Sequence, residues 1–108
     1  LGEVYFSYID ANAVKAWKKH NRMTLNLVVP LGKVRFVFCD AFNDGHYRVE
    51  DIGEDNYVRL TVPPGIWFGF QGIALQPSLV TNIADLQHDA AEVERQAVSS
   101  FDYQWEKV

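Results

Sequence analysis

Cysteine is almost missing from this sequence: Cys39 is the only one among 108 residues, so the chain holds no internal disulfide. Long apolar runs are missing too, because no stretch is long enough to cross a bilayer, and no secretory signal segment is recognisable. These absences exclude a disulfide-stapled scaffold and a membrane-spanning helix. We therefore expect a cytoplasmic protein with no membrane partner, in which Cys39 is a small core residue.

Positive charge is also scarce. The sequence has ten Lys and Arg residues and fourteen Asp and Glu residues, which gives a net charge of −4. This charge disfavours a nucleic acid as partner. The basic side chains nevertheless crowd into one short stretch, Lys15, Lys18, Lys19, His20 and Arg22. A local positive patch on an acidic protein fits a small anionic ligand. The alternative is that the patch is a solvated strand edge whose lysines prevent pairing with another strand.

The hydrophobic pattern has a period of two along most of the chain, which predicts strands. We expect one domain over residues 1–108, all-β, with about eight strands arranged as a sandwich, jelly roll or small barrel. One short C-terminal helix is predicted at Asp89–Gln96, with Asp89 and Glu92 as a capping-box-like pair. The predicted strands cover residues 4–9, 14–20, 23–29, 34–40, 47–53, 56–62, 66–72 and 79–85.

Glycine and proline mark the predicted connections. Pro30–Lys33 lies between two alternating runs and predicts a hairpin. Pro63–Gly65 predicts a type II turn in which Gly65 takes a positive φ. Ala41–His46 predicts a loop with Asp44 and Gly45 at its tip.

The strand at 14–20 places polar groups on both of its faces. A period of two puts Lys18 and His20 on one face and Lys15 and Lys19 on the other. The simplest structural interpretation is that Lys18 extends its ammonium into water and that His20 is a half-buried, hydrogen-bonded residue.

Five blocks in the same order carry a family resemblance from about Gly2 to Trp105: GEVYFS, VKAWKKHNRMTLNLVVPLGKVRFVFCD, NYVRLTVPPGIWFGFQGI, TNIADLQHDAAE and FDYQW. The chain resembles the dTDP-4-dehydrorhamnose 3,5-epimerase family, and more closely its short epimerase-like relatives in the cupin superfamily. The resemblance implies a cupin-type jelly-roll β-barrel and a homodimer formed through sheet contacts. Family members carry an N-terminal strand region ahead of the first block, so we expect that this segment is missing here.

The resemblance also implies site residues. The related nucleotide-sugar 3,4-ketoisomerases carry an Arg-Gly-x-His-x-His stretch, which reads here as residues 15–20, KAWKKH. Lys15 then occupies the position of the arginine that binds a diphosphate, although a lysine lacks the bidentate geometry of an arginine. Lys18 stands for the histidine base, and His20 matches the second histidine. Asp85 matches the aspartate that orients the base.

Three positions depart from the pattern of the epimerases. Thr81 stands where the family has a tyrosine acid, and Leu25 stands near the lysine that steadies the enolate. Phe68 stands where the Pro-x-Gly-x-x-His block has its histidine. The catalytic residues are therefore altered relative to the family.

Epimerisation beside a ketone needs a base, a group that holds the enolate oxygen, and an acid on the opposite face. An unperturbed lysine titrates at about 10.4, so Lys18 acts as a base only if burial or neighbouring cations lower its pKa. Alternatively, protonated Lys18 stabilises an enolate while neutral His20 removes the proton.

Other side chains are candidates for substrate binding. Tyr5 is a possible proton donor or a packing residue, and Trp67 either stacks on a base or sugar or packs in the core. Asn82 is a polar residue on an otherwise apolar strand. The predicted substrate-binding set is Lys15, Arg22, Trp67, Asn82 and Tyr5.

No cofactor and no metal are expected. Many cupins hold iron or manganese with a His-x-His pair, a carboxylate and a later histidine. Lys18 and Phe68 replace two of these histidines, and neither His46 nor His88 has ligand spacing.

Three functions remain open at this point. The first is a nucleotide-sugar epimerase or isomerase of carbohydrate biosynthesis that abstracts a proton next to a ketone. The second is a catalytically inactive cupin that binds a nucleotide-sugar or another small anionic ligand. The third is a structural dimer without a ligand, which the retained His20, Asp85 and basic cluster disfavour.

Overall fold

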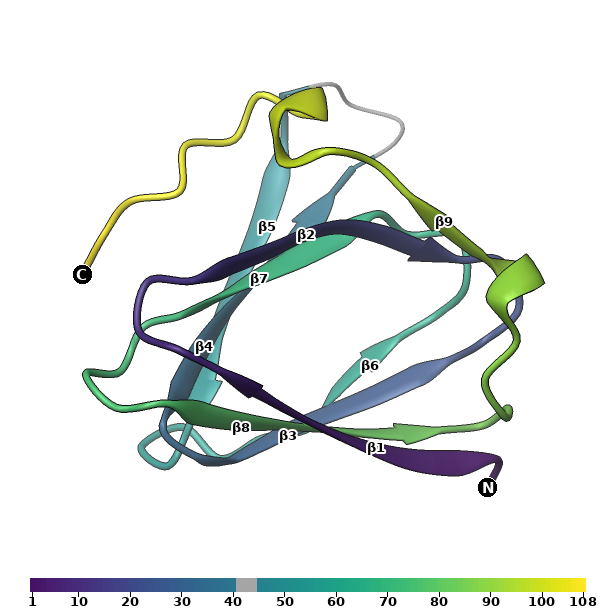
Figure 1. Ribbon diagram of the computed structural model, residues 1–108, viewed down its shortest axis with the longest axis horizontal. Helices are drawn as coiled ribbons and strands as arrows, with labels where there is room; N and C mark the ends of the chain where they lie inside the picture. Colours follow the sequence, from purple (N-terminus) through teal and green to yellow (C-terminus); the bar gives the residue numbers. More distant parts are fainter. Residues whose placement is uncertain (41–44) are drawn as a thin grey trace.

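A computed structural model describes residues 1–40 and 45–108, and strands dominate this part of the chain (Figure 1). Residues 41–44 of the predicted loop, Asp44 among them, lie outside the described residues. The described part contains nine strands: β1 (Glu3–Ile9), β2 (Val14–His20), β3 (Leu25–Leu31), β4 (Lys33–Cys39), β5 (Tyr47–Gly53), β6 (Leu60–Val62), β7 (Phe68–Gly72), β8 (Ser78–Ala84) and β9 (Val93–Arg95). No helix among the described residues is long and apolar enough to span a membrane.

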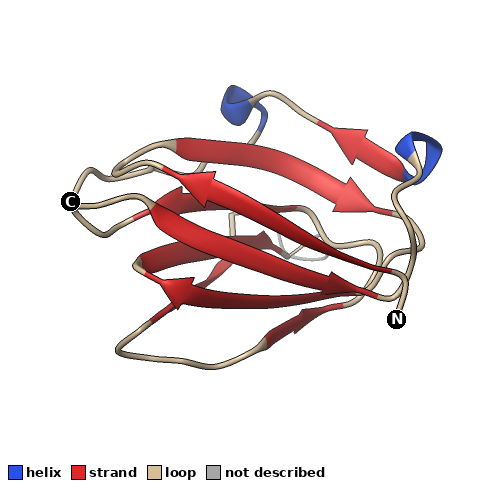
Figure 2. Ribbon diagram, turned by 60° about the horizontal axis from the view of Figure 1, so that its bottom comes forward, coloured by secondary structure: helices blue, strands red, loops and turns tan. Residues whose placement is uncertain are grey.

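The strands form two antiparallel sheets that face each other (Figure 2). One sheet has the order β1-β8-β3-β6, and the other has the order β5-β4-β7-β2-β9. Most neighbours in a sheet are distant in sequence, as in a jelly roll, so the all-β jelly-roll prediction is confirmed. Alternating side chains of both sheets point inward and build one apolar core, which includes Leu25, Leu27, Val34, Phe36 and Ile52.

The hairpin predicted at Pro30–Lys33 is wrong. Strands β3 and β4 lie in different sheets, so this turn is a corner that carries the chain from one sheet to the other. Gly32 makes the corner possible with φ at +84°. The backbone of Lys33 donates to Ser78 Oγ at 3.0 Å, which satisfies a polar group that strand pairing leaves free.

The helix predicted at Asp89–Gln96 is wrong beyond its first turn. Only a 3₁₀ turn, Ala90–Glu92, forms, and Asp89 caps it by accepting a hydrogen bond from the backbone of Ala91. The chain then extends into β9, which pairs with β2 at the edge of the second sheet (Figure 1). Glu92 does not complete a capping box, because its carboxylate is bound by another part of the chain. A second 3₁₀ turn, Val98–Ser100, follows β9.

A β-bulge in β2 changes which of its side chains share a face. Lys15 pairs with Phe70 and Lys18 pairs with Phe68, so three steps along β2 match two along β7. Lys15 therefore faces the inside of the barrel together with Lys18, and its prediction on the opposite face is wrong. Gly69 lies opposite the bulge, where a Cβ atom would come within 2.5 Å of Ala16 Cβ.

The C-terminal segment, yellow in Figure 1, forms an extended strap whose rings pack on Trp17 and Tyr47 at the outer face of the second sheet. Trp17 is buried beneath this strap, with its ring 5.2 Å from Phe101 and 5.3 Å from Trp105 between centroids. The Trp17 indole N–H donates to the carbonyl of Val98 at 3.0 Å. This packing fixes Trp17 outward and thereby turns Lys18 inward.

We predict that Gly69→Ala lowers the free energy of unfolding by about 1–3 kcal/mol, because the new methyl group overlaps Ala16 at the bulge. Urea denaturation followed by tryptophan fluorescence measures the change. The double variant Ala16→Gly/Gly69→Ala is expected to recover part of the loss. Equal stability of the parent and the single variant would contradict this account of the bulge.

Candidate functional site

A cavity of about 610 Å³ lies between the two sheets. Its apolar wall includes Leu25, Leu27, Phe68, Phe70 and Val80. Its polar side chains are Tyr5, Ser7, Lys15, Lys18, His20, Asn82, His88, Arg95 and Gln96. An apolar cavity with a few convergent polar groups is the usual form of a small-molecule site.

His20 lies at the end of β2 and is only 7% exposed. Its Nδ1 is 2.5 Å from Glu92 Oε2, and its ring stacks on Phe68 with 6.5 Å between centroids. His20 Nε2 is buried and has no hydrogen-bond partner among the described residues. In a neutral ring, a proton on Nδ1 that is donated to Glu92 leaves the Nε2 lone pair unpartnered at the cavity wall.

Glu92 is only 4% exposed and holds three groups at once. Besides His20, it accepts hydrogen bonds from the backbone of Met23 at 2.8 Å and of Arg22 at 3.0 Å. Burial by itself would raise the pKa of Glu92, but the hydrogen bonds from His20, Met23 and Arg22 outweigh it, so the pKa lies below its ordinary value. Glu92 is therefore an anion at neutral pH and orients the imidazole.

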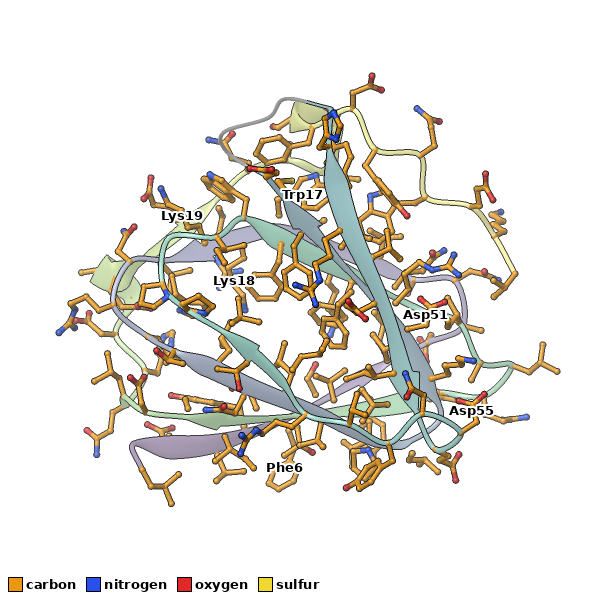
Figure 3. All side chains as sticks on the ribbon, turned by 180° about the vertical axis from the view of Figure 1, so that it is seen from behind. Phe6, Trp17, Lys18, Lys19, Asp51 and Asp55 are labelled. Atoms are coloured by element: carbon orange, nitrogen blue, oxygen red, sulfur yellow. The ribbon has the colours of Figure 1, made fainter. Side chains whose placement is uncertain are left out.

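Lys18 projects from the same strand into the space between the sheets, whereas Trp17 and Lys19 lie on the other side of β2 (Figure 3). Its ammonium nitrogen is 5.8 Å from the centre of the Phe68 ring. Burial lowers the pKa of Lys18, and the positive charges of Arg95 and Lys15 lower it further. The amine is thus held in a site that disfavours its charged form.

Three further predicted residues line the same cavity. Lys15 donates to Ser7 Oγ at 3.2 Å and to the carbonyl of Tyr8 at 3.1 Å, which ties β2 to β1. Asn82 accepts from the backbone of Asn26 at 3.1 Å. Tyr5 presents a buried hydroxyl without a hydrogen-bond partner among the described residues. Burial and the neighbouring Glu3 carboxylate raise the pKa of Tyr5, so its hydroxyl is protonated at neutral pH.

Three other predicted residues lie outside the cavity. Trp67 is on the outer face, where Lys19 Nζ lies 5.2 Å from its ring centre. Arg22 is exposed and pairs with Asp89 at 2.9 Å. Asp85 is exposed and accepts a hydrogen bond from the backbone of Thr24, so the carboxylate that contacts His20 is Glu92 instead.

Thr81, at the position of the family's tyrosine acid, is also not part of the cavity wall. It pairs with Phe6 on β1, and its side chain is on the outer side of the first sheet. The tyrosine that does face the cavity comes from β1, as Tyr5.

Sequence reasoning missed Glu92 and Arg95 as site residues. Both come from the segment around β9, which pairs with β2 so that Arg95 lies opposite Lys18. The contact between His20 and Glu92 spans 72 positions, so no local pattern indicates it. The acidic residues of this segment also fit a helical cap, and that interpretation concealed their role.

The residues present do not fit a cupin metal centre. Across residues 1–40 and 45–108, no three His, Cys, Asp or Glu side chains are placed where they could share a metal ion. His20 has one ring nitrogen committed to Glu92, and Phe68 lies beside it instead of a second imidazole.

The chain is similar to several solved structures. A dTDP sugar isomerase from Desulfovibrio desulfuricans G20 is 35% identical, with a TM-score of 0.90 over 96% of this chain and 71% of that chain. A dTDP-4-dehydrorhamnose 3,5-epimerase from Sulfolobus tokodaii is 22% identical, with a TM-score of 0.77 over 94% of this chain and 61% of that chain. A sugar 3,4-ketoisomerase from Thermoanaerobacterium thermosaccharolyticum, solved with TDP, is 15% identical, with a TM-score of 0.73 over 87% and 66%.

The epimerase and the ketoisomerase share the fold with this chain, and the isomerase is close enough to share the family. No family model matches the sequence, and no curated protein sequence matches it either.

We predict that Glu92→Ala lowers the free energy of unfolding by about 3 kcal/mol, because it leaves His20 and two backbone N–H groups unpaired in a buried place. Glu94→Ala is the matched control, since Glu94 pairs with Lys19 at the surface and its removal costs about 0–1 kcal/mol. Urea denaturation measures both. Equal stability of the two variants would show that the hydrogen bond between His20 and Glu92 does not hold the segment before β9 in place.

Proposed function

This chain belongs to the family of dTDP-sugar isomerases and epimerases, and from that premise we propose that it isomerises or epimerises a nucleotide-linked keto sugar. The reaction is the removal of a proton from the carbon next to the ketone and its return at another carbon or on the other face. The observation that carries the proposal is the unpartnered Nε2 of His20 in the cavity, with Nδ1 held by Glu92. We place the reaction in carbohydrate biosynthesis.

His20 is the base. Histidine is the side chain most often used as a general base in enzymes, and Nε2 of His20 has no other partner among the described residues. Glu92 fixes the tautomer and stabilises the imidazolium that forms when Nε2 takes the proton. Lys18 lies on the same face of β2, two positions away, and activates the carbonyl group.

Tyr5 is the proton donor. It belongs to β1 in the first sheet, whereas His20 belongs to β2 in the second, so the two groups face the cavity from opposite walls. Epimerisation needs this arrangement, because the proton is removed from one face of the sugar and returned to the other. Its raised pKa keeps the phenol protonated and able to donate.

Lys15 and Arg95 bind the diphosphate. Both line the cavity, and both carry basic side chains. Lysine binds phosphate as a point charge, whereas arginine can form paired hydrogen bonds. The position of Arg95 opposite Lys18 on β9 supplies the guanidinium that the KAWKKH stretch lacks.

The experiment follows solvent deuterium into TDP-4-keto-6-deoxyglucose by mass spectrometry. We predict that the parent protein incorporates deuterium next to the ketone and that His20→Gln lowers the rate by about 10²–10⁴-fold, since that is the usual contribution of a general base. His46→Gln is the control, because His46 is exposed and lies outside the cavity.

A thermal-shift titration with TDP separates the two leading functions. Stabilisation by TDP without deuterium incorporation would make the protein the inactive nucleotide-sugar binder. The absence of both stabilisation by TDP and deuterium incorporation would contradict both functions.

We also propose that the protein is a homodimer, formed through the outer face of the first sheet. Five large apolar side chains on this face are between 38% and 68% exposed: Val4, Phe6, Tyr8, Leu31 and Ile83. Figure 3 shows Phe6 on the outer side of β1, away from Lys18. The cross-strand partners Leu79, Thr81 and Val28 carry no charge either, so two copies of the face complement each other about a two-fold axis.

We predict that Phe6→Glu converts the dimer to a monomer, because it buries a carboxylate against the same face of a second copy. Light scattering during size-exclusion chromatography measures the mass. Leu75→Glu is the matched control, since Leu75 is an exposed leucine outside both sheets. A monomeric parent, or a dimeric Phe6→Glu variant, would refute this interface.

A further inference from the structure

Four lysines lie in the strands, and three of them are paired. Lys15 is bound to Ser7 and the Tyr8 carbonyl, Lys19 to Glu94 at 3.0 Å, and Lys33 to Asp55 at 2.9 Å. Lys18 makes no hydrogen bond or ion pair with any residue that the structure describes. It lies on the same face of β2 as His20, whose Nε2 has no partner among the described residues, and both side chains line the cavity.

The surroundings of Lys18 keep it unpaired. The nearest buried carboxylate, Glu92, already accepts from His20, Arg22 and Met23, so it has little capacity left for an ammonium. The charged neighbours on either side, Lys15 and Arg95, are cations. Burial and these charges favour the neutral amine, which is the nucleophilic form of lysine.

We propose that Lys18 is a nucleophile that binds the carbonyl carbon of the substrate covalently, as an iminium ion. The inference rests on the proposed function only for the identity of the carbonyl compound, a nucleotide-linked keto sugar. The unpaired amine, which shares a largely apolar cavity and one face of β2 with a histidine that can exchange a proton, is what points to this chemistry.

The step balances with the groups at hand, because one proton first moves from the ammonium of Lys18 to Nε2 of His20 and leaves a neutral amine and an imidazolium. The Nζ lone pair forms a bond to the carbonyl carbon while the C=O π electrons move to oxygen. That oxygen takes one proton from the amine and a second from the imidazolium of His20, and it leaves as water while the C=N bond forms. His20 is then neutral at Nε2 and is ready to remove the adjacent C–H proton.

An iminium would also take over the role of a lysine that this site lacks. Leu25, an apolar residue of the cavity wall, lies near the position at which the family carries the lysine that stabilises the enolate. Because an iminium nitrogen is a stronger electron sink than a ketone oxygen, it acidifies the adjacent C–H without a second cation at that oxygen. Lys18 thus combines activation of the carbonyl with anchoring of the sugar.

The test incubates the protein with TDP-4-keto-6-deoxyglucose and sodium cyanoborohydride, which reduces an iminium in preference to a ketone. The intact mass is expected to rise by the mass of the probe less one oxygen atom, and peptide mapping is expected to locate the adduct on Lys18. Excess TDP should suppress the adduct. Lys18→Arg should abolish it, whereas Lys19→Arg, a change on the outer face of the same strand, should retain it.

The outcomes separate this inference from the proposed function. Deuterium incorporation without an adduct overturns the iminium and leaves the isomerase standing. An adduct on Lys18 without deuterium incorporation supports the nucleophile and overturns the isomerase. An adduct on other lysines, or one that survives in a folded Lys18→Arg variant as judged by circular dichroism, overturns the assignment to Lys18.

Discussion

The hydrogen bond between His20 and Glu92 is the contact on which the site depends. It joins the end of β2 to the turn that precedes β9, and the same carboxylate also binds the backbone of Arg22 and Met23. A carboxylate is buried here, which is costly unless its oxygens are hydrogen-bonded. Glu92 meets that condition, and the imidazole is consequently held with one nitrogen occupied and the other free.

The rest of the cavity follows from how β2 is bent around this contact. The bulge opposite Gly69 brings Lys15 onto the same face as Lys18 and His20, and Trp17 anchors the other face beneath the C-terminal strap. One short strand therefore brings the side chains of Lys15, Lys18 and His20 to the same cavity. The opposite sheet contributes Tyr5, so the two walls place a phenol and an imidazole on the same cavity.

Much of the fold was predictable from the chain, and the errors have physical causes. The period of two located the strands, because alternate side chains of a two-layer protein must be apolar. The turn at Pro30–Lys33 predicts a hairpin although it is a corner, because a hairpin and a corner between sheets can both use a glycine with a positive φ. Only the placement of β3 and β4 in different sheets distinguishes the two. The segment at Asp89–Gln96 has helical composition, yet pairing with β2 satisfies its backbone instead.

The sequence by itself determined the strand pattern and the basic stretch with Lys18 and His20, since these depend on local order and periodicity. The resemblance of its five blocks to a known family indicated the jelly roll and the family. Only the tertiary structure decided that Glu92 is the partner of His20, that Lys15 turns inward, and that Trp67, Arg22 and Asp85 lie outside the cavity. The reason is that a bulge shifts alternation by one position, and that the contact between β2 and the turn before β9 joins residues far apart in the chain. Neither leaves a mark on the spacing of nearby residues.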